Sequence, residues 1–190
     1  MRSDLVSGLR PAFLLTLLFA LLLGVAYPLV LTGAGQLLFP AQANGSLVRD
    51  DAGTVRGSML LGQAFAGDRY FQGRPSAAGN GYDPLASSGS NFGPASKKLI
   101  DRVTADQKRL GAGAPADLLQ ASGSGLDPEI SPEAARFQVV RVAKARGIAP
   151  DRVVQLVDAN VQERLFGLIG EPRVNVLALN QALDRQEGAR

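Results

Sequence analysis

The residues best suited to chemistry lie in four polar, glycine-rich stretches, at positions 57–63, 70–76, 87–94 and 122–128. Arg74 stands between a glycine and a proline, where its guanidinium could bind a carboxylate or a phosphate through two parallel hydrogen bonds, or form a structural salt bridge. Asp127 and Glu129 flank Pro128 and could act as a carboxylate pair in acid–base catalysis. The simpler interpretation is that Asp127 closes an Asx turn and that Glu129 is solvated.

Glycine loops that precede helices can also hold a phosphate with their backbone N–H groups. The third and fourth stretches each precede a predicted helix, but neither has the Gly-x-x-x-x-Gly-Lys-Ser/Thr spacing of a phosphate-binding loop. The alternative is that they form tight turns, in which Gly89 and Gly125 supply a positive φ angle. We therefore treat Arg74, Gly89, Asn91, Gly125 and Asp127 as candidate loop or interface positions and assign no cofactor to them.

Composition removes several classes of site. The 190 residues include no Cys and no His, which excludes disulfides, thiolate metal sites, cysteine nucleophiles, Ser–His–Asp triads and imidazole ligands. The remaining side chains form no recognisable set of nucleophile, base and orienting group, so we predict no catalytic residue and no metal site. The 20 Lys and Arg residues only slightly outnumber the 17 Asp and Glu residues and are scattered, which argues against a nucleic-acid partner.

One segment is suited to lipid. No charged residue occurs between Arg10 and Arg49, and residues 12–31 are almost entirely apolar. Twenty helical residues span about 30 Å, the thickness of the hydrocarbon core of a bilayer. The sequence therefore predicts a transmembrane helix over residues 12–32, with a kink or fraying near Pro28, which has no backbone N–H to donate.

Charges on the two sides of this helix predict its orientation. Arg2 and Arg10 precede it, whereas Arg49, Asp50 and Asp51 follow it. The positive-inside rule then places the N-terminus in the cytoplasm and the rest of the chain outside. The predicted segments are a cytoplasmic N-terminus, a linker and an extracytoplasmic domain, at residues 1–11, 33–45 and 46–190.

The competing interpretation is a cleaved signal peptide, with Ala41-Gln42-Ala43 as the cleavage motif. The length of the apolar run argues against it, because signal peptides have an apolar region of about 7–15 residues. Within the helix, Ala20 and Gly24 have the small-xxx-small spacing that lets two membrane helices pack closely. We therefore take Ala20 and Gly24 as a candidate packing face toward a partner helix.

The elements that position the polar stretches are mainly helices. Periodic apolar residues predict four helices, at 94–110, at 132–146, from about 150, and after residue 175. Ser131 and Asn175 are the expected N-caps of two of them, and Gly147 is the expected terminator of the 132–146 helix. Short apolar runs at 59–61 and 70–71 are the expected strand pieces. The fold class is thus a single N-terminal transmembrane α-helix followed by one extracytoplasmic α+β domain with a helix-rich C-terminal half.

Five segments, taken together, resemble the C subunit of the bacterial Kdp potassium-transporting ATPase. They follow the order and spacing of that family and read GSMLLGQAF (57–65), YFQGRPSA (70–77), YDPLASSGSNFGPAS (82–96), ASGSGLDPEISPEAARFQVVRVAKARG (121–147) and GEPRVNVLALNQALD (170–184). Members of the family often carry His where this chain has Gln72 and Glu129. A role that needs an imidazole at either position therefore does not apply here.

The resemblance implies a non-catalytic accessory subunit of an inner-membrane pump that takes up K⁺ at the expense of ATP. Its implied partners are a channel-like K⁺-translocating subunit, a P-type ATPase subunit and a small membrane subunit, and ATP with Mg²⁺ is used by the complex. The family's C subunit is described as a catalytic chaperone that raises the ATP affinity of the P-type subunit. Because ATP is cytoplasmic and the glycine loops are predicted outside, assembly and coupling fit this chain better than direct contact with the nucleotide.

Two alternatives from other classes remain open at this point. One is a membrane-anchored or secreted extracytoplasmic enzyme, against which the missing catalytic constellation counts. The other is a binding module for a small polar ligand, against which the scarcity of aromatic residues counts, because the chain has no Trp and three Tyr.

Overall fold

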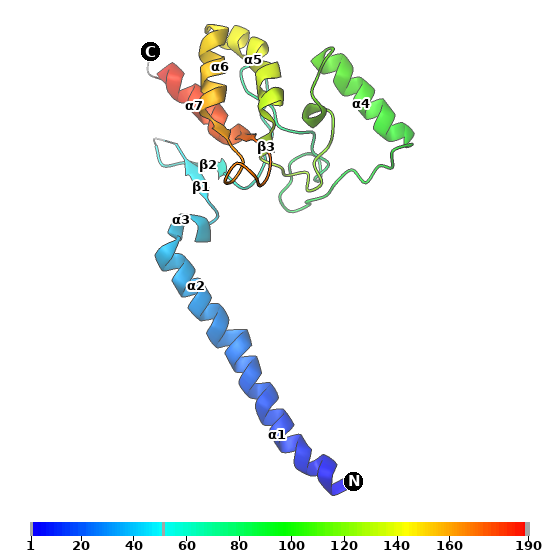
Figure 1. The fold of residues 1–190 in the computed structure, drawn as a ribbon, viewed down its shortest axis with the longest axis vertical. Coiled ribbons are helices and arrows are strands. Elements are labelled where there is room, and N and C mark those ends of the chain that lie inside the picture. The colour runs from blue at the N-terminus through cyan, green and yellow to red at the C-terminus, as the bar shows by residue number, and fades with distance from the viewer. Residues whose placement is uncertain (1, 51, 189–190) are drawn as a thin grey trace. The chain divides into compact units, whose positions relative to one another are not determined.

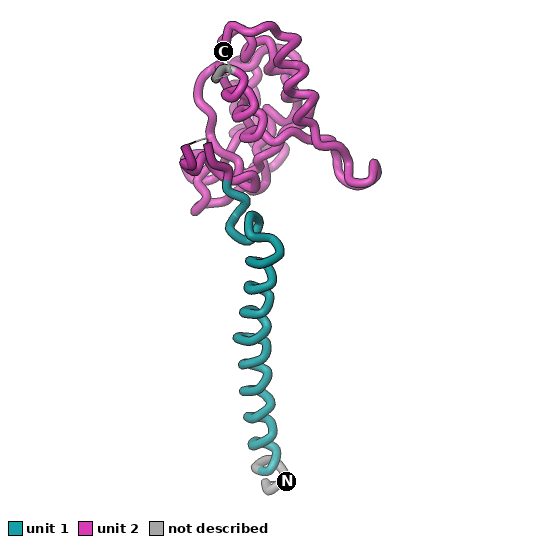
Figure 2. The backbone as a smooth tube through the Cα atoms, turned by 90° about the vertical axis from the view of Figure 1, so that its left-hand side faces the viewer, with its two compact units in different colours: residues 1–47 teal, residues 48–190 magenta. Residues whose placement is uncertain are grey.

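The computed structural model describes residues 2–50 and 52–188 of the chain. The chain divides into two compact units, residues 1–47 and residues 48–190, which are coloured separately in Figure 2. The first unit is a helical segment, and the second is a folded unit that contains all four glycine-rich stretches.

The N-terminal unit is one long apolar helical run. It comprises α1 (Arg2–Leu21), a π-helical turn η1 (Leu22–Ala26) and α2 (Tyr27–Leu38), followed by the short helix α3 (Pro40–Ala43) (Figure 1). Its stretch Ser7–Leu38, 32 residues long, is sufficiently apolar and long to cross a membrane. Within the described residues, its large apolar side chains are exposed, a pattern that lipid around the helix would satisfy.

Two details differ from the sequence expectation for this helix. The π-helical turn ends two residues before Pro28 and contains Gly24, whose carbonyl a regular α-helix would direct at the proline ring. The wider turn accommodates the proline, and the helix continues beyond residue 32 to Leu38. Residues 33–45, expected as a linker, are therefore mainly helical, with an interruption at Phe39, because the residue before a proline is disfavoured in the α region.

The folded unit combines helices with two small sheets. Its strands are β1 (Leu47–Arg49), β2 (Val55–Ser58), β3 (Glu129–Ile130), β4 (Val161–Gln162) and β5 (Arg173–Asn175). Strands β1 and β2 form one sheet, while the other is antiparallel in the order β3-β5-β4, with Val174 of β5 paired to both Ile130 and Val161. Its helices are α4 (Lys97–Leu110), the 3₁₀ turn η2 (Ala116–Leu118), α5 (Pro132–Arg146), α6 (Pro150–Ala159) and α7 (Val176–Gly188). A helix-rich α+β unit is what the sequence predicted, although the strands lie elsewhere.

The core lies among α5, α6, α7 and the three-stranded sheet, which Figure 1 shows grouped together while α4 stands apart. Its fully buried large side chains include Val142, Val153, Val157, Leu179 and Leu183. These positions recur with helical spacing, so each of the three helices turns one apolar face inward. The helix α4 contributes only its C-terminal Leu110 to the rim of this core.

The expected helix signals are confirmed at three ends. The Ser131 side chain accepts a hydrogen bond from the Ala134 N–H at 3.1 Å, and Gly147 ends α5 in the left-handed conformation with φ of 65°. Asn175 caps α7 by accepting from the Ala178 N–H at 3.1 Å.

Other expectations are wrong. Helix α4 begins at Lys97 instead of at residue 94, because the chain first makes a turn in which the Ser96 N–H donates to the Gly93 carbonyl at 2.9 Å. Residues 59–61 form a turn and a bend, and residues 70–71 are not in a strand. The local apolar runs were thus insufficient to define strands, because pairing depends on distant partners.

The two N-terminal serines of α5 and α4 provide a matched test of capping. Ser131→Ala removes the hydrogen bond to Ala134 and should lower the free energy of unfolding by about 1 kcal/mol. Ser96→Ala is the control, because Ser96 occupies the N-cap position of α4 without a side-chain cap hydrogen bond. Urea unfolding of the full chain in detergent, followed by circular dichroism, measures both; equal effects of the two substitutions would contradict the assignment.

Candidate functional site

Three of the glycine-rich stretches meet in space, at a place that we call the loop junction, formed by residues 73–89 and 122–128. Two backbone hydrogen bonds join its segments: the Ser88 N–H donates to the Ser124 carbonyl at 2.9 Å, and the Ser122 N–H donates to the Pro75 carbonyl at 3.2 Å. The first stretch reaches it as well, because the Gly62 N–H donates to the Leu126 carbonyl at 2.8 Å. Segments 36 to 64 residues apart in the chain are thereby held together without a regular sheet.

Arg74 and Asp127, both singled out from the sequence, pair with each other across the loop junction. The Arg74 Nη1 atom lies 2.9 Å from the Asp127 Oδ2 atom, and both side chains are half-buried. The other carboxylate oxygen of Asp127 accepts from the Glu129 N–H at 3.0 Å, which confirms the Asx turn. Glu129 is not solvated as expected, since its carboxylate pairs with the Arg173 guanidinium at 2.9 Å. The two acidic groups are therefore structural partners of arginines.

Gly125 has the conformation that the sequence predicted. Its φ angle is 69°, and a Cβ atom there would lie 2.7 Å from the Ala78 nitrogen and 2.7 Å from the Ser88 oxygen. Only a residue without a side chain fits between these two segments of the loop junction.

For Gly89 the expectation of a positive φ is wrong. It is absent from the positive-φ residues among those described, and it is restricted by space instead, because a Cβ atom would lie 2.9 Å from the Gly123 carbonyl oxygen. Asn91, two residues further along, is exposed and has a φ of 51°, a conformation that asparagine tolerates better than most residues. The structure thus brings Arg74, Gly89, Gly125 and Asp127 into one junction and leaves Asn91 at its surface.

Two residues of the junction were missed from the sequence. The Ser76 hydroxyl donates to the Gly125 carbonyl at 2.6 Å and accepts from the Tyr82 N–H at 2.7 Å. The Tyr82 hydroxyl in turn donates to the Arg74 carbonyl at 2.5 Å. Burial raises the pKa of the Tyr82 phenol above its ordinary value, and the nearby Asp127 carboxylate adds to this effect. The sequence signal for Tyr82 was its aromatic ring, which stands within a run of Gly, Asn, Asp and Pro residues that otherwise favour turns.

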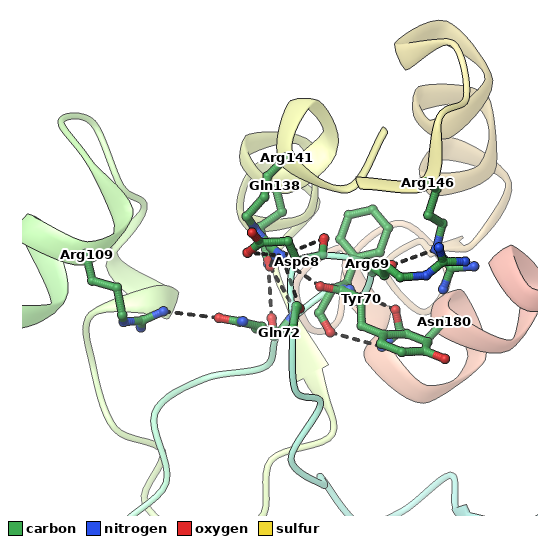
Figure 3. Close-up of polar contacts among 11 residues, drawn as sticks. Asp68, Arg69, Tyr70, Gln72, Arg109, Gln138, Arg141, Arg146 and Asn180 are labelled. Atoms are coloured by element: carbon green, nitrogen blue, oxygen red, sulfur yellow. Dashed lines mark hydrogen bonds and ion pairs between the residues drawn. The ribbon is translucent and has the colours of Figure 1, made fainter. Parts of the chain in front are cut away.

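Beside the junction, residues 68–72 run across α5 and α7, held by side-chain amides (Figure 3). The buried Asn180 accepts from the Phe71 N–H at 2.8 Å and donates to the Phe71 carbonyl at 2.9 Å. The buried Gln138 does the same for Gln72, accepting at 2.8 Å and donating at 3.0 Å. Each amide therefore satisfies the N–H and the carbonyl of one residue, as a neighbouring strand would, although residues 68–70 form a turn and a bend.

The sequence held a signal for this pair of amides, which we call the amide clamp. Gln138 lies four residues after Ala134 and four residues before Val142, which are both buried. Because residues four apart share one face of a helix, Gln138 lies on the buried face of α5. Asn180 likewise follows the buried Val176 by four residues. A polar residue on the apolar face of a helix needs a hydrogen-bond partner, and here the partner is a segment of backbone.

Two arginines of α5 extend the clamp along the same segment. The Arg141 guanidinium donates to the Asp68 carbonyl at 2.9 Å and to the Tyr70 carbonyl at 3.0 Å. Arg146 donates to the Arg69 carbonyl at 2.6 Å and stacks over the Tyr70 ring at 4.8 Å from its centre. Successive carbonyls of residues 68–72 are thus each bound by a side chain of α5 or α7 (Figure 3).

Two charged side chains, Asp68 and Arg109, lie close enough to Arg141 to affect its pKa. Burial lowers the pKa of its guanidinium; the Asp68 carboxylate opposes this shift, and the Arg109 charge adds to it. Arg109 comes from α4 and donates to the Gln72 side-chain oxygen at 3.1 Å, which links α4 to the clamp (Figure 3). The neutral side-chain amide of Gln72 thus accepts a hydrogen bond from a charged group.

A cleft of about 260 Å³ lies between the loop junction and the clamp. Its polar lining consists of Gln72, Arg74, Tyr82, Asp106, Arg109 and Gln138. These groups are engaged with one another or with their neighbours, as Arg109 is with Asp106 at 3.1 Å. Within residues 2–50 and 52–188, no three side chains of the His, Cys, Asp and Glu types are grouped so that they could hold a metal ion. The arrangement is suited to holding loops in fixed positions.

The two helix residues selected from the sequence lie in the other unit. Ala20 is in α1 and Gly24 is in the π-helical turn η1, and both are exposed. A Cβ atom added at Gly24 would meet no atom within 4 Å, so this position is open to a neighbouring helix.

The close approach at Gly125 leads to a stability prediction. Gly125→Ala should lower the free energy of unfolding by about 1–3 kcal/mol, because the new methyl group meets two backbone atoms at an unfavourable φ. Gly123→Ala is the matched control in the same stretch, because a Cβ atom there has no neighbour within 4 Å. Thermal unfolding of the full chain in detergent compares them, and a Gly125→Ala chain as stable as the control would overturn this account of the junction.

Comparison with known proteins gives a consistent answer over nearly the whole chain. Residues 9–185 match the family model described as KdpC, K⁺-transporting ATPase, c chain. A protein of Caulobacter vibrioides (strain NA1000 / CB15N), named Potassium-transporting ATPase KdpC subunit, is 58% identical over 185 residues, which cover 95% of this chain and 94% of that protein.

Similar proteins of the same name occur in Myxococcus xanthus and Bradyrhizobium diazoefficiens. The first is 58% identical over 174 residues, covering 88% of this chain and 82% of the relative. The second is 53% identical over 194 residues, covering 93% of this chain and 96% of the relative. The matched range includes the apolar helix, the loop junction and the clamp, so the chain belongs to the KdpC family of K⁺-transporting ATPase subunits.

Proposed function

We propose that this chain is a non-catalytic, single-pass subunit of an ATP-driven K⁺ uptake pump in the inner membrane. The observation that carries the proposal is the family match over residues 9–185, which includes both the apolar helix and the folded unit. The chain needs no catalytic group for this role. Its partners in the pump are a channel-like K⁺-translocating subunit, a P-type ATPase subunit and a small membrane subunit.

In this proposal the helix lies in the bilayer with residues 1–11 in the cytoplasm and the folded unit outside. The charge asymmetry supports it, since Arg10 precedes the apolar stretch and Asp50 follows it. Nucleotide is then out of reach of the loop junction and the clamp. Any increase in the ATP affinity of the P-type subunit is transmitted through the membrane helix and through contacts outside the membrane.

The internal bonding of the folded unit supports a role in assembly. Arg74 and Arg109 line the cleft, yet they pair with Asp127 and Asp106. Paired charges that hold loops together stabilise the shape of a surface, and a fixed surface lowers the entropic cost of binding a partner. Such a unit serves as a rigid body against which another subunit can dock.

The orientation is tested with a C-terminal tag and a protease. Protease added to intact spheroplasts should degrade the tag, while a cytoplasmic marker protein stays intact. A tag that survives until the spheroplasts are lysed would show that the folded unit is inside. The mature N-terminus, determined by mass spectrometry, should precede the helix; a start at Asn44 would establish cleavage instead.

Assembly is tested by purification of the tagged full chain in mild detergent from cells that express the whole pump. Three further subunits should co-purify, and the purified assembly should hydrolyse ATP in a K⁺-stimulated manner. Recovery of the chain without any ATPase subunit would overturn the proposed function.

Variants of the helix refine the same experiment. Ala20→Ile combined with Gly24→Ile should reduce co-purification about tenfold, because larger side chains keep a partner helix at a distance. The control is Leu18→Ile combined with Leu22→Ile, which introduces the same residues at the same spacing elsewhere on the helix. Equal recovery with both pairs would mean that Ala20 and Gly24 face lipid.

A further inference from the structure

The loop between β4 and β5 carries the densest run of exposed apolar side chains in the described part of the folded unit. Leu165, Phe166, Leu168 and Ile169 are 58%, 84%, 83% and 63% exposed. Exposed single leucines are common on protein surfaces, but four large apolar residues within five positions are unusual. We call residues 165–169 the apolar tip.

Backbone hydrogen bonds within the tip close it into a turn. Leu165 and Ile169 exchange backbone hydrogen bonds, with the Leu165 N–H donating at 2.9 Å and the Ile169 N–H donating at 3.0 Å. Arg164 and Glu171 form an ion pair across its base. Because the backbone is fixed, presenting these side chains to a partner costs little conformational entropy.

Phe166 provides an independent observation. Its φ angle is 53°, in the left-handed region, which bulky residues rarely adopt. Gly167 follows with φ of 73°, where glycine costs nothing. A phenylalanine is thus held in a strained conformation and projects into solvent, although a glycine or an asparagine would suit that position better. Strain kept at an exposed position is typical of functional surfaces.

We propose that the apolar tip is an anchor that inserts into an apolar groove on the extracytoplasmic surface of another protein subunit of the pump. This inference rests on the proposed function. Burial of the exposed side chains supplies the driving force. Four side chains are a small part of the roughly 800 Å² per partner that a stable interface buries, so the tip acts as a hot spot within a larger contact.

Charge favours a protein groove over a lipid surface as the occupant. Residues 163–171 carry Glu163, Arg164 and Glu171, a net charge of −1. Segments that lie on a membrane surface are instead rich in Lys and Arg, and the tip also lacks the Trp and Tyr that favour the lipid interface. A second copy of the chain is disfavoured as well, because two tips meeting about a twofold axis would bring their acidic flanks together.

The membrane helix makes a small anchor sufficient. A folded unit tied to the bilayer meets a partner in the same membrane at a high effective concentration, so the second contact forms without a full loss of translational freedom. The apolar tip then needs only to fix the position of the folded unit on its partner and to slow the dissociation of the two.

The first test replaces the tip in the full chain within the whole pump. Phe166→Ser combined with Leu168→Ser should lower the recovery of the ATPase subunits about tenfold or more under detergent and salt stress. The matched control is Leu85→Ser combined with Val140→Ser, at positions 96% and 69% exposed, and it should leave recovery unchanged. Recovery that is equal for the two double variants would overturn the anchor.

A second variant separates recognition from folding. Phe166→Asn suits the left-handed conformation, so the thermal stability of the full chain should be equal or higher while recovery of the partners falls. If the residue served only the fold, stability and recovery would change in the same direction.

A photo-crosslinking amino acid at position 168 identifies the occupant directly. A product with another subunit of the pump supports the proposal, whereas products with lipid or with a second copy of the chain, or no product, overturn it. The proposed function is judged separately, by the wild-type chain. If wild-type chain recovers no ATPase subunit, the function is wrong; if it does and the tip variants do equally well, only the anchor is wrong.

Discussion

The structure depends on one constraint, which is that backbone polar groups buried without a strand partner must be satisfied by side chains. Residues 68–72 cross the faces of α5 and α7, and the amides of Gln138 and Asn180 complete both hydrogen bonds of Gln72 and Phe71. With only short strands in this unit, side chains perform the role of a sheet. The long N-terminal loops are thereby fastened to a helical core.

This arrangement explains why the chemistry-bearing residues of the glycine-rich stretches are occupied internally. Arg74 binds Asp127, Ser76 binds Gly125 and Tyr82, and Gly125 leaves room for two neighbouring segments. Such bonds hold loops of low intrinsic order in one arrangement at a cost in side-chain entropy. The outcome is a body whose loops are held in place, which suits the role in assembly that we propose for it.

Sequence reasoning succeeded where the determinants were local. The cap at Ser131, the terminator at Gly147, the cap at Asn175 and the Asx turn at Asp127 each depend on residues within four positions, and all are present. It failed for strands and for Gly89, because strand pairing and close approach depend on segments distant in the chain. The amide clamp lies between these cases: its polar residues on apolar faces were visible, whereas their backbone partners were not.

Each of the two units has apolar side chains that are exposed in the described part of the chain. The helix exposes apolar side chains that lipid can bury, and Ala20 and Gly24 interrupt them with small residues at which another helix can approach. In the described part of the folded unit many arginines and carboxylates pair with each other, and Phe166 and Leu168 of the apolar tip are among its most exposed apolar side chains. Neither surface needs to bind strongly alone. In the proposed assembly, a helix that lies in the same membrane as the partner makes the contact of the tip an intramolecular one, and each contact then strengthens the other.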